Sequence, residues 1–152
     1  MNFVHIPRTG GTSIEAALGI QQHQHAPASR VTSPRFTFVR HPLDRLISAW
    51  ELGRKRNRVS GELTEIALIG QLSGSNDMTM WPQTYWTDAE IDFIGRFESL
   101  ESDFSKLSNA KLPHLNASER SPWQEYFTPP MFRIAADYYL KDFETFGYPI
   151  EL

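Results

Sequence analysis

Short apolar runs, glycine turns and amphipathic stretches follow one another in the first third of the chain. Residues 3–6 are mostly apolar and end at Pro7, which is typical of a short buried strand. Apolar residues then recur at helical spacing from Ile14 to Leu18, and Gly19 marks the end of the helix. The pattern therefore predicts a strand, a glycine turn and a helix, in that order.

A second segment repeats this order. Residues 36–39 indicate a strand, and Pro42 stands where the first turn of a helix tolerates proline. Four apolar residues then share one helical face: Leu43, Leu46, Ile47 and Trp50. Two successive strand–turn–helix units favour an α/β fold, in which helices flank a mainly parallel central sheet to give three layers.

The middle of the chain has a weaker pattern. Residues 62–72 indicate a helix and residues 74–85 a loop. Thr87 and Glu90 have the spacing of a capping box, whereas residues 91–94 favour a strand.

The last third is rich in aromatic residues. We expect one helix around Leu100 and Phe104 and another that begins at Thr128. The large rings from Phe143 to Tyr148 predict core packing rather than a binding surface.

Composition places the chain among globular domains. The 152 residues are 40% hydrophobic and 22% charged, which excludes a disordered chain and predicts one domain over residues 1–152. The formal net charge is −3, so no overall positive field favours nucleic acid or an anionic membrane as a partner. The absence of cysteine excludes disulfides, thiol catalysis and cysteine-based metal sites.

The sequence also lacks the marks of membrane or secretory targeting. No apolar run approaches the ~18–20 residues that a membrane span needs. The first residues carry neither a basic segment nor a long apolar stretch. We therefore expect no signal peptide and a cytoplasmic location.

The turn between the first strand and the first helix carries the clearest candidate chemistry. Gly10 and Gly11 let the backbone approach an anion closely, and the N–H groups of a helix start favour negative charge. Thr12 and Ser13 add hydroxyl groups. A nucleoside triphosphatase loop has a lysine after its second glycine, whereas the cation here, Arg8, precedes the glycines. A plain glycine turn with a Ser/Thr helix cap is the alternative interpretation.

Two further pairs of residues are candidates. Arg40 after the second strand and Ser48 on the next helix could bind one phosphate, through an arginine fork and a hydroxyl. His23 and His25 have the i, i+2 spacing of strand-borne metal ligands, although no third ligand lies nearby in the sequence. Solvated loop histidines are the simpler interpretation.

These segments together resemble the sulfotransferases that use 3′-phosphoadenosine-5′-phosphosulfate (PAPS). Residues 3–13 resemble the loop that binds the 5′-phosphosulfate, and residues 36–50 resemble the motif that binds the 3′-phosphate. Residues 94–104, 112–118 and 139–148 are similar to the carbohydrate branch, which includes the heparan 2-O- and chondroitin enzymes. The resemblance is collinear over nearly the whole chain. It implies a P-loop-like α/β fold that works without a metal.

The resemblance also implies roles for single residues. Five consecutive residues would hold the 5′-phosphosulfate: Thr9, Gly10, Gly11, Thr12 and Ser13. Arg40 and Ser48 would hold the 3′-phosphate, and Ser118 would add a contact from a loop that closes on the nucleotide. Arg8 stands where the family has a lysine and would stabilise charge on the bridging oxygen and the 5′-phosphate.

His25 is the candidate general base. In the carbohydrate branch a histidine just before the second strand takes the proton of the acceptor, and His25 matches it better than His23. We therefore expect a sulfotransferase that moves a sulfuryl group from PAPS to an acceptor hydroxyl on a sugar or glycan. One alternative is a catalytically weak module that binds PAPS or its product, 3′-phosphoadenosine-5′-phosphate (PAP), which the replacement of lysine by Arg8 favours. A metal-dependent P-loop kinase is the other.

Overall fold

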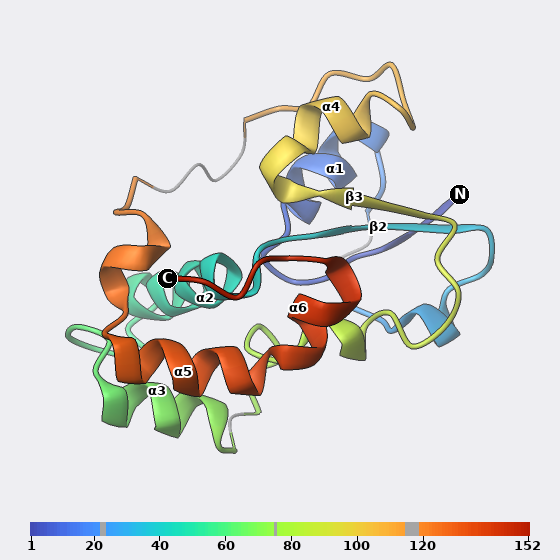
Figure 1. Cartoon of the computed structure of the whole chain (residues 1–152). Helices are drawn as coiled ribbons and strands as arrows, with labels where there is room; N and C mark the ends of the chain where they lie inside the picture. Colours follow the sequence, from blue (N-terminus) through green and yellow to red (C-terminus); the bar gives the residue numbers. More distant parts are fainter. Residues whose placement is uncertain (22–23, 75, 115–118) are drawn as a thin grey trace. The chain divides into compact units, whose positions relative to one another are not determined.

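Figure 1 shows the computed structural model, which describes residues 1–21, 24–74, 76–114 and 119–152. Its elements group into two units, each described by itself. The first unit contains Met1–Arg40 and Gln83–Ser118, and the second contains His41–Pro82 and Glu119–Leu152. A single domain over residues 1–152 stays a prediction.

A parallel sheet forms the centre of the first unit. Its strands are β1 (Asn2–Val4), β2 (Arg35–Val39) and β3 (Phe93–Arg96), in that spatial order. Phe3 pairs with Phe36, and Phe36 pairs with Phe93, so aromatic positions form a row across the sheet. The predicted α/β fold with a parallel sheet is confirmed, although β1 ends at Val4 and β3 begins later than the sequence pattern indicates.

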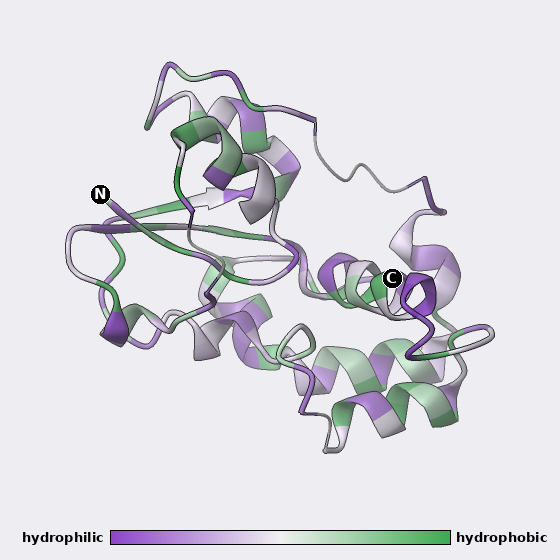
Figure 2. Ribbon diagram, turned by 180° about the vertical axis from the view of Figure 1, so that it is seen from behind, coloured by the Kyte–Doolittle hydropathy of each residue, from purple (hydrophilic) through white to green (hydrophobic). Residues whose placement is uncertain are grey.

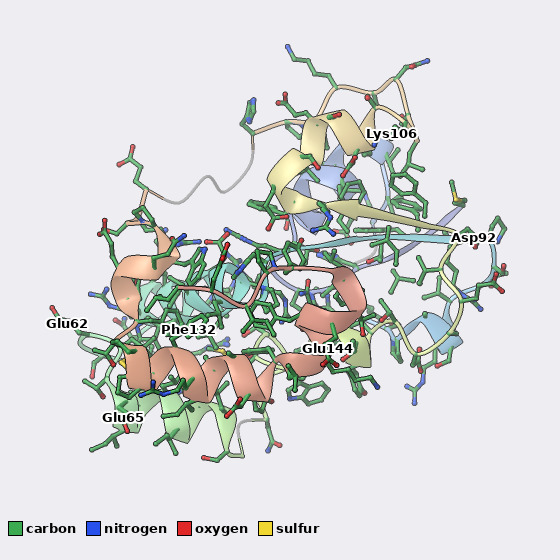
Figure 3. The ribbon with its side chains drawn as sticks, in the orientation of Figure 1. Glu62, Glu65, Asp92, Lys106, Phe132 and Glu144 are labelled. Carbon is green, nitrogen blue, oxygen red and sulfur yellow. The ribbon has the colours of Figure 1, made fainter. Side chains whose placement is uncertain are left out.

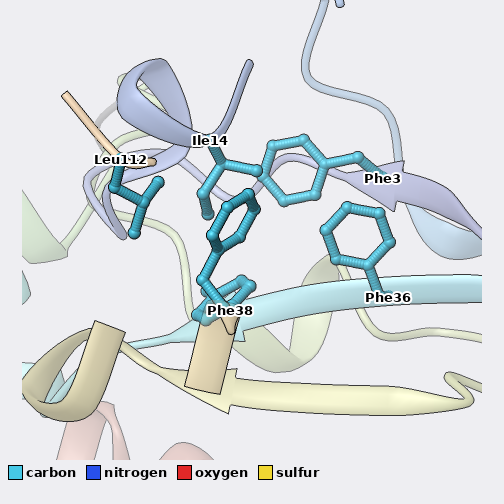
Figure 4. Packing of buried hydrophobic residues seen from close by; sticks show 6 residues of the cluster. Phe3, Ile14, Phe36, Phe38 and Leu112 are labelled. Carbon is cyan, nitrogen blue, oxygen red and sulfur yellow. The ribbon is translucent and has the colours of Figure 1, made fainter. Parts of the chain in front are cut away.

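Two helices pack against the sheet of this unit, α1 (Gly11–Leu18) and α4 (Leu100–Phe104). Figure 4 shows the core between them and the strands. Its buried residues are Phe3, Ile14, Phe36, Phe38, Phe104 and Leu112. A Cβ at Gly95 would overlap the ring of Phe38, so this glycine makes room for the core. As predicted, Gly19 ends α1, and its backbone is left-handed with a φ of 63°.

Asp103 fastens α4 to the end of β3. Its carboxylate accepts hydrogen bonds from the backbone N–H of Arg96 at 2.9 Å and from the Ser99 hydroxyl at 2.8 Å. The ammonium of the exposed Lys106, which is labelled in Figure 3, donates to the same carboxylate at 2.6 Å. The Lys106 bond, followed by the bonds from Arg96 and Ser99, lowers the pKa of Asp103 to about 2.

Helices make up most of the second unit. They are α2 (Pro42–Lys55), α3 (Glu65–Leu72), the short turn η4 (Trp123–Tyr126), α5 (Pro129–Tyr138) and α6 (Leu140–Phe146). The predicted apolar face of α2 is buried, and α3 packs on α5 (Figure 1). Figure 2 shows hydrophobic and hydrophilic bands alternating along these two helices.

The aromatic C-terminal segment belongs to the core of the second unit, as predicted. Phe143, Phe146 and Tyr148 are buried. Tyr139 is fully buried, and its hydroxyl donates to the carbonyl oxygen of Met80 at 2.6 Å. Among the described residues, no helix is long and apolar enough to cross a membrane.

The capping-box alternative at Thr87 and Glu90 is wrong, because residues 87–90 form no helix. The Asp88 carboxylate instead accepts hydrogen bonds from the backbone N–H of Ser29 at 2.8 Å and from its hydroxyl at 2.6 Å. A contact between distant segments thus replaces the local cap.

Candidate nucleotide site

The turn between β1 and α1 contains two residues with a left-handed backbone conformation. The backbone φ angle is 68° at Arg8 and 86° at Gly10. Glycine adopts this conformation readily, whereas for Arg8 it costs about 1–2 kcal/mol. Thr9 is fully buried, and its hydroxyl donates to the carbonyl oxygen of Ile6 at 2.9 Å. This bond closes the turn and gives the loop a fixed shape.

The loop leads directly into the N-terminus of α1. Gly10 holds the capping position, and its carbonyl oxygen accepts from the N–H groups of Ser13 at 3.1 Å and Ile14 at 3.3 Å. No side chain of the described residues caps this end, so a Ser/Thr cap, the alternative interpretation, is wrong. An uncapped helix start directs N–H groups and positive dipole charge toward an anion.

Arg40 directly follows β2, and its guanidinium reaches the loop. The Nη1 atom donates to the carbonyl oxygen of Arg8 at 3.2 Å. The Cζ atom lies 3.8 Å from the centre of the Phe97 ring, a cation–π contact. A guanidinium carries five N–H donors, enough to bond a carbonyl and an anion together.

Gln83 fixes the backbone of Arg40. The Arg40 N–H donates to Oε1 of Gln83 at 2.9 Å, and Nε2 of Gln83 donates to the Arg40 carbonyl oxygen at 2.8 Å. Gln83 is fully buried and begins the short turn η2 (Gln83–Tyr85). Because both bonds are buried, they hold the start of the Arg40 side chain in one place.

His25 lies beside His5, which follows the end of β1. Its Nδ1 is 2.8 Å from the backbone carbonyl oxygen of His5. A carbonyl only accepts, so Nδ1 carries the hydrogen, and the neutral ring keeps its lone pair on Nε2. The ring of His25 also packs edge-on against His5, with centroids 4.4 Å apart, and against Trp86 at 6.0 Å. These contacts orient His25 with Nε2 as its basic atom.

His5 links His25 to the loop. Its Nδ1 donates to the buried Glu15 carboxylate at 2.8 Å, and its ring fills the space that a side chain on Gly11 would take. Burial lowers the pKa of His5, and the nearby His25 adds to this, against the opposing effect of Glu15. The His5 ring therefore lies between the start of α1 and His25, and its burial disfavours the protonated form.

Comparison with known protein families matches residues 1–149 with the sulfotransferase family. The chain belongs to this family. No curated protein and no solved structure matches it. Membership supports sulfuryl transfer as the general activity and, with it, a nucleotide sulfate donor and an acceptor.

The predicted site residues of this sulfotransferase family member fall into three groups. Unit 1 holds Arg8, Thr9, Gly10, Gly11, Thr12, Ser13, His25 and Arg40. Ser48 is buried on α2 in the second unit, so its pairing with Arg40 stays a prediction. Ser118 and the alternative histidine, His23, lie outside the described residues.

Four neighbours of the site were not expected from the sequence: His5, Glu15, Gln83 and Phe97. The spacing of His5 and Glu15, one at a strand end and one on the next helix, is a signal that could have paired them. Gln83 contacts a residue 43 positions earlier, and nothing local in the sequence indicates this contact.

Two further observations concern other places where a metal or ligand could bind. Among the described residues, no group of three or more His, Asp or Glu side chains is placed to hold a metal. The second unit contains a cavity of about 410 Å³, lined in part by Trp50, Arg58, Gln71 and Met78. None of the predicted site residues that the structure describes lines this cavity.

Proposed function

We propose that the protein transfers a sulfuryl group from PAPS to a hydroxyl group of a carbohydrate. The observation that carries the proposal is the chain of contacts from His25 through His5 to Gly11. It sets a histidine with a basic Nε2 beside a loop suited to a 5′-phosphosulfate. A general base and an anion loop are the two parts that transfer to a hydroxyl requires.

In the proposed reaction the acceptor oxygen attacks sulfur while the bond from sulfur to the bridging oxygen breaks. His25 Nε2 takes the proton of the acceptor hydroxyl, and PAP leaves with the bonding electrons. Arg8 and the N–H groups at the start of α1 stabilise the charge that grows on the bridging oxygen and the 5′-phosphate. Arg40, with Ser48, holds the 3′-phosphate throughout. Positioning and charge stabilisation supply most of the rate, as in phosphoryl transfer.

The carbohydrate acceptor is supported by the resemblance of residues 94–104, 112–118 and 139–148 to the carbohydrate branch. A screen with radiolabelled PAPS tests it. Desulfated heparan, chondroitin and simple glycosides are the expected acceptors, and phenols and hydroxysteroids are the comparison set. Label transfer to phenols or steroids alone would contradict the carbohydrate assignment.

A module that binds PAPS or PAP without efficient transfer is the second candidate, because Arg8 replaces the usual lysine. It predicts tight PAP binding together with no label transfer to any member of the panel. Transfer that requires both Arg8 and His25 contradicts this candidate.

A further inference from the structure

Arg40 connects two parts of the candidate nucleotide site. Its guanidinium donates to the carbonyl oxygen of Arg8 at 3.2 Å, although the two residues are 32 positions apart. Arg8 has a left-handed backbone with φ of 68°, which residues with a side chain rarely adopt. Such a conformation persists only where its surroundings hold it. The bond from Arg40 does this, because it fixes the carbonyl group of the strained residue.

Arg40 is itself held from two sides. Gln83 bonds its backbone N–H at 2.9 Å and its carbonyl at 2.8 Å, and Phe97 lies 3.8 Å from the guanidinium carbon. The same Phe97 ring supports the loop, since a Cβ added at Gly10 would lie 3.3 Å from its Cδ2 atom. Arg40 and the loop thus both pack against the Phe97 ring. We therefore expect a substitution of Arg40 to alter the conformation of the loop.

We propose that Arg40 is a positioning residue for the phosphosulfate loop, in addition to the role toward the 3′-phosphate that the proposed function gives it. The inference rests on that proposed function. Through the carbonyl of Arg8, the guanidinium keeps the loop in the conformation that binds the 5′-phosphosulfate. A nucleotide that lacks the 3′-phosphate therefore still depends on Arg40.

Calorimetric titration with two nucleotides tests the inference. PAPS carries both groups, whereas adenosine 5′-phosphosulfate carries the same 5′ group and no 3′-phosphate. Arg40→Ala is expected to weaken binding of both, that of adenosine 5′-phosphosulfate by about tenfold, the usual effect of losing a hydrogen bond from a charged group. Arg40→Lys keeps the charge but not the planar fork, and is expected to weaken adenosine 5′-phosphosulfate in the same direction.

Arg30→Ala is the matched control. Arg30 is an exposed arginine of the same unit, at the end of the short turn η1 (Ala28–Arg30), and its loss should leave both affinities unchanged. Wild-type affinity of Arg40→Ala for adenosine 5′-phosphosulfate, with loss of the preference for PAPS, would overturn the inference and keep the proposed function. If circular dichroism shows that Arg40→Ala does not fold, the same comparison with Arg40→Lys decides. A wild-type chain that binds neither PAPS nor PAP contradicts the proposed function itself.

Discussion

The imidazole of His5 occupies the space that a side chain on residue 11 would need. A Cβ added at Gly11 would overlap three atoms of this ring, which is itself held by the Glu15 carboxylate at 2.8 Å. The glycine that begins α1 therefore serves close packing, since its φ is not among the positive ones. A contact of this kind makes the shape of the loop sensitive to a single methyl group.

Gly11→Ala is accordingly expected to destabilise the fold by about 1–3 kcal/mol, the usual cost of overpacking. It should also weaken PAP binding, because the start of α1 must shift. Urea unfolding and titration with PAP measure the two effects. Gly70→Ala on α3 is the control: nothing lies within 4 Å of an added Cβ there, and helix propensity predicts a gain of up to about 1 kcal/mol. Equal stability of the two variants would show that the His5 ring moves aside without cost.

His25→Ala is expected to lower turnover by about 10²–10⁴-fold, the range for loss of a general base, while PAP affinity stays near that of the wild type. The physical reason is that the Nε2 lone pair of His25 takes a proton and binds no part of the nucleotide. Rates with a validated acceptor, together with PAP titration, check this. His23→Ala is the comparison variant. If His25→Ala keeps the turnover of the wild type and His23→Ala loses it, the general base is His23.

The pH dependence of stability is expected to report on His5. Its pKa is lower in the folded chain than the usual value of 6.5, so below this value the unfolded chain binds more protons. Above about pH 6.5, titration of His5 should not change the free energy of unfolding. The free energy of unfolding should fall as the pH decreases toward the folded pKa, by at most about 1.4 kcal/mol per pH unit.

Urea unfolding between pH 5 and 8 measures this dependence, and the His5→Gln variant isolates it from the other titrating groups. Glu15→Gln removes the partner that raises the pKa of His5, so the fall in stability should extend to lower pH. A wild-type curve parallel to that of His5→Gln would contradict the prediction.

The sequence predicted those parts of the fold in which local pattern and tertiary packing agree. The helix after Pro42 and its buried face are one case, because spacing alone defines the apolar stripe. The predicted start of β3 was wrong because pairing decides it: Asp92 bonds the backbone N–H of Arg35 at 2.7 Å before the strand begins at Phe93. The loop expected at residues 74–85 likewise contains Met80 and Gln83, both buried by contacts with distant residues.

In the candidate site, too, local sequence indicates some residues, whereas others depend on contacts between distant segments. Arg8, Gly10 and Gly11 could be singled out because an anion loop needs its residues in sequence. The supports of the loop, among them Phe97 and Gln83, come from separate segments that meet only after folding. Sequence therefore indicates the candidate ligand-binding residues more readily than the residues that support them.

Nucleotide binding is expected to stabilise the fold. At about 100 times its dissociation constant, PAP should add about 2.7 kcal/mol, which for a domain of this size raises Tm by roughly 5–10 °C. Differential scanning fluorimetry measures the shift. Arg40→Ala should remove most of it, because the variant loses a charged fork. ATP, which lacks a 3′-phosphate, is the control ligand, and an equal shift with ATP would contradict the 3′-phosphate assignment.

Substitutions of Arg8 test whether an arginine at this position, where the resemblance implies a lysine, supports catalysis. Lysine offers a compact charge that can follow the bridging oxygen, whereas arginine offers a wider planar fork that is always protonated. The charge that Arg8 meets grows in the transition state, so Arg8→Ala should lower turnover more than PAP affinity, by about 10²–10³-fold. Arg8→Lys should keep at least part of the activity, and steady-state rates with a validated acceptor compare the two. The backbone of Arg8 is left-handed, so the thermal midpoint of each variant is the control for folding. Unchanged turnover of Arg8→Ala would reduce Arg8 to a structural anchor, and the charge stabilisation would then rest on the N–H groups of α1.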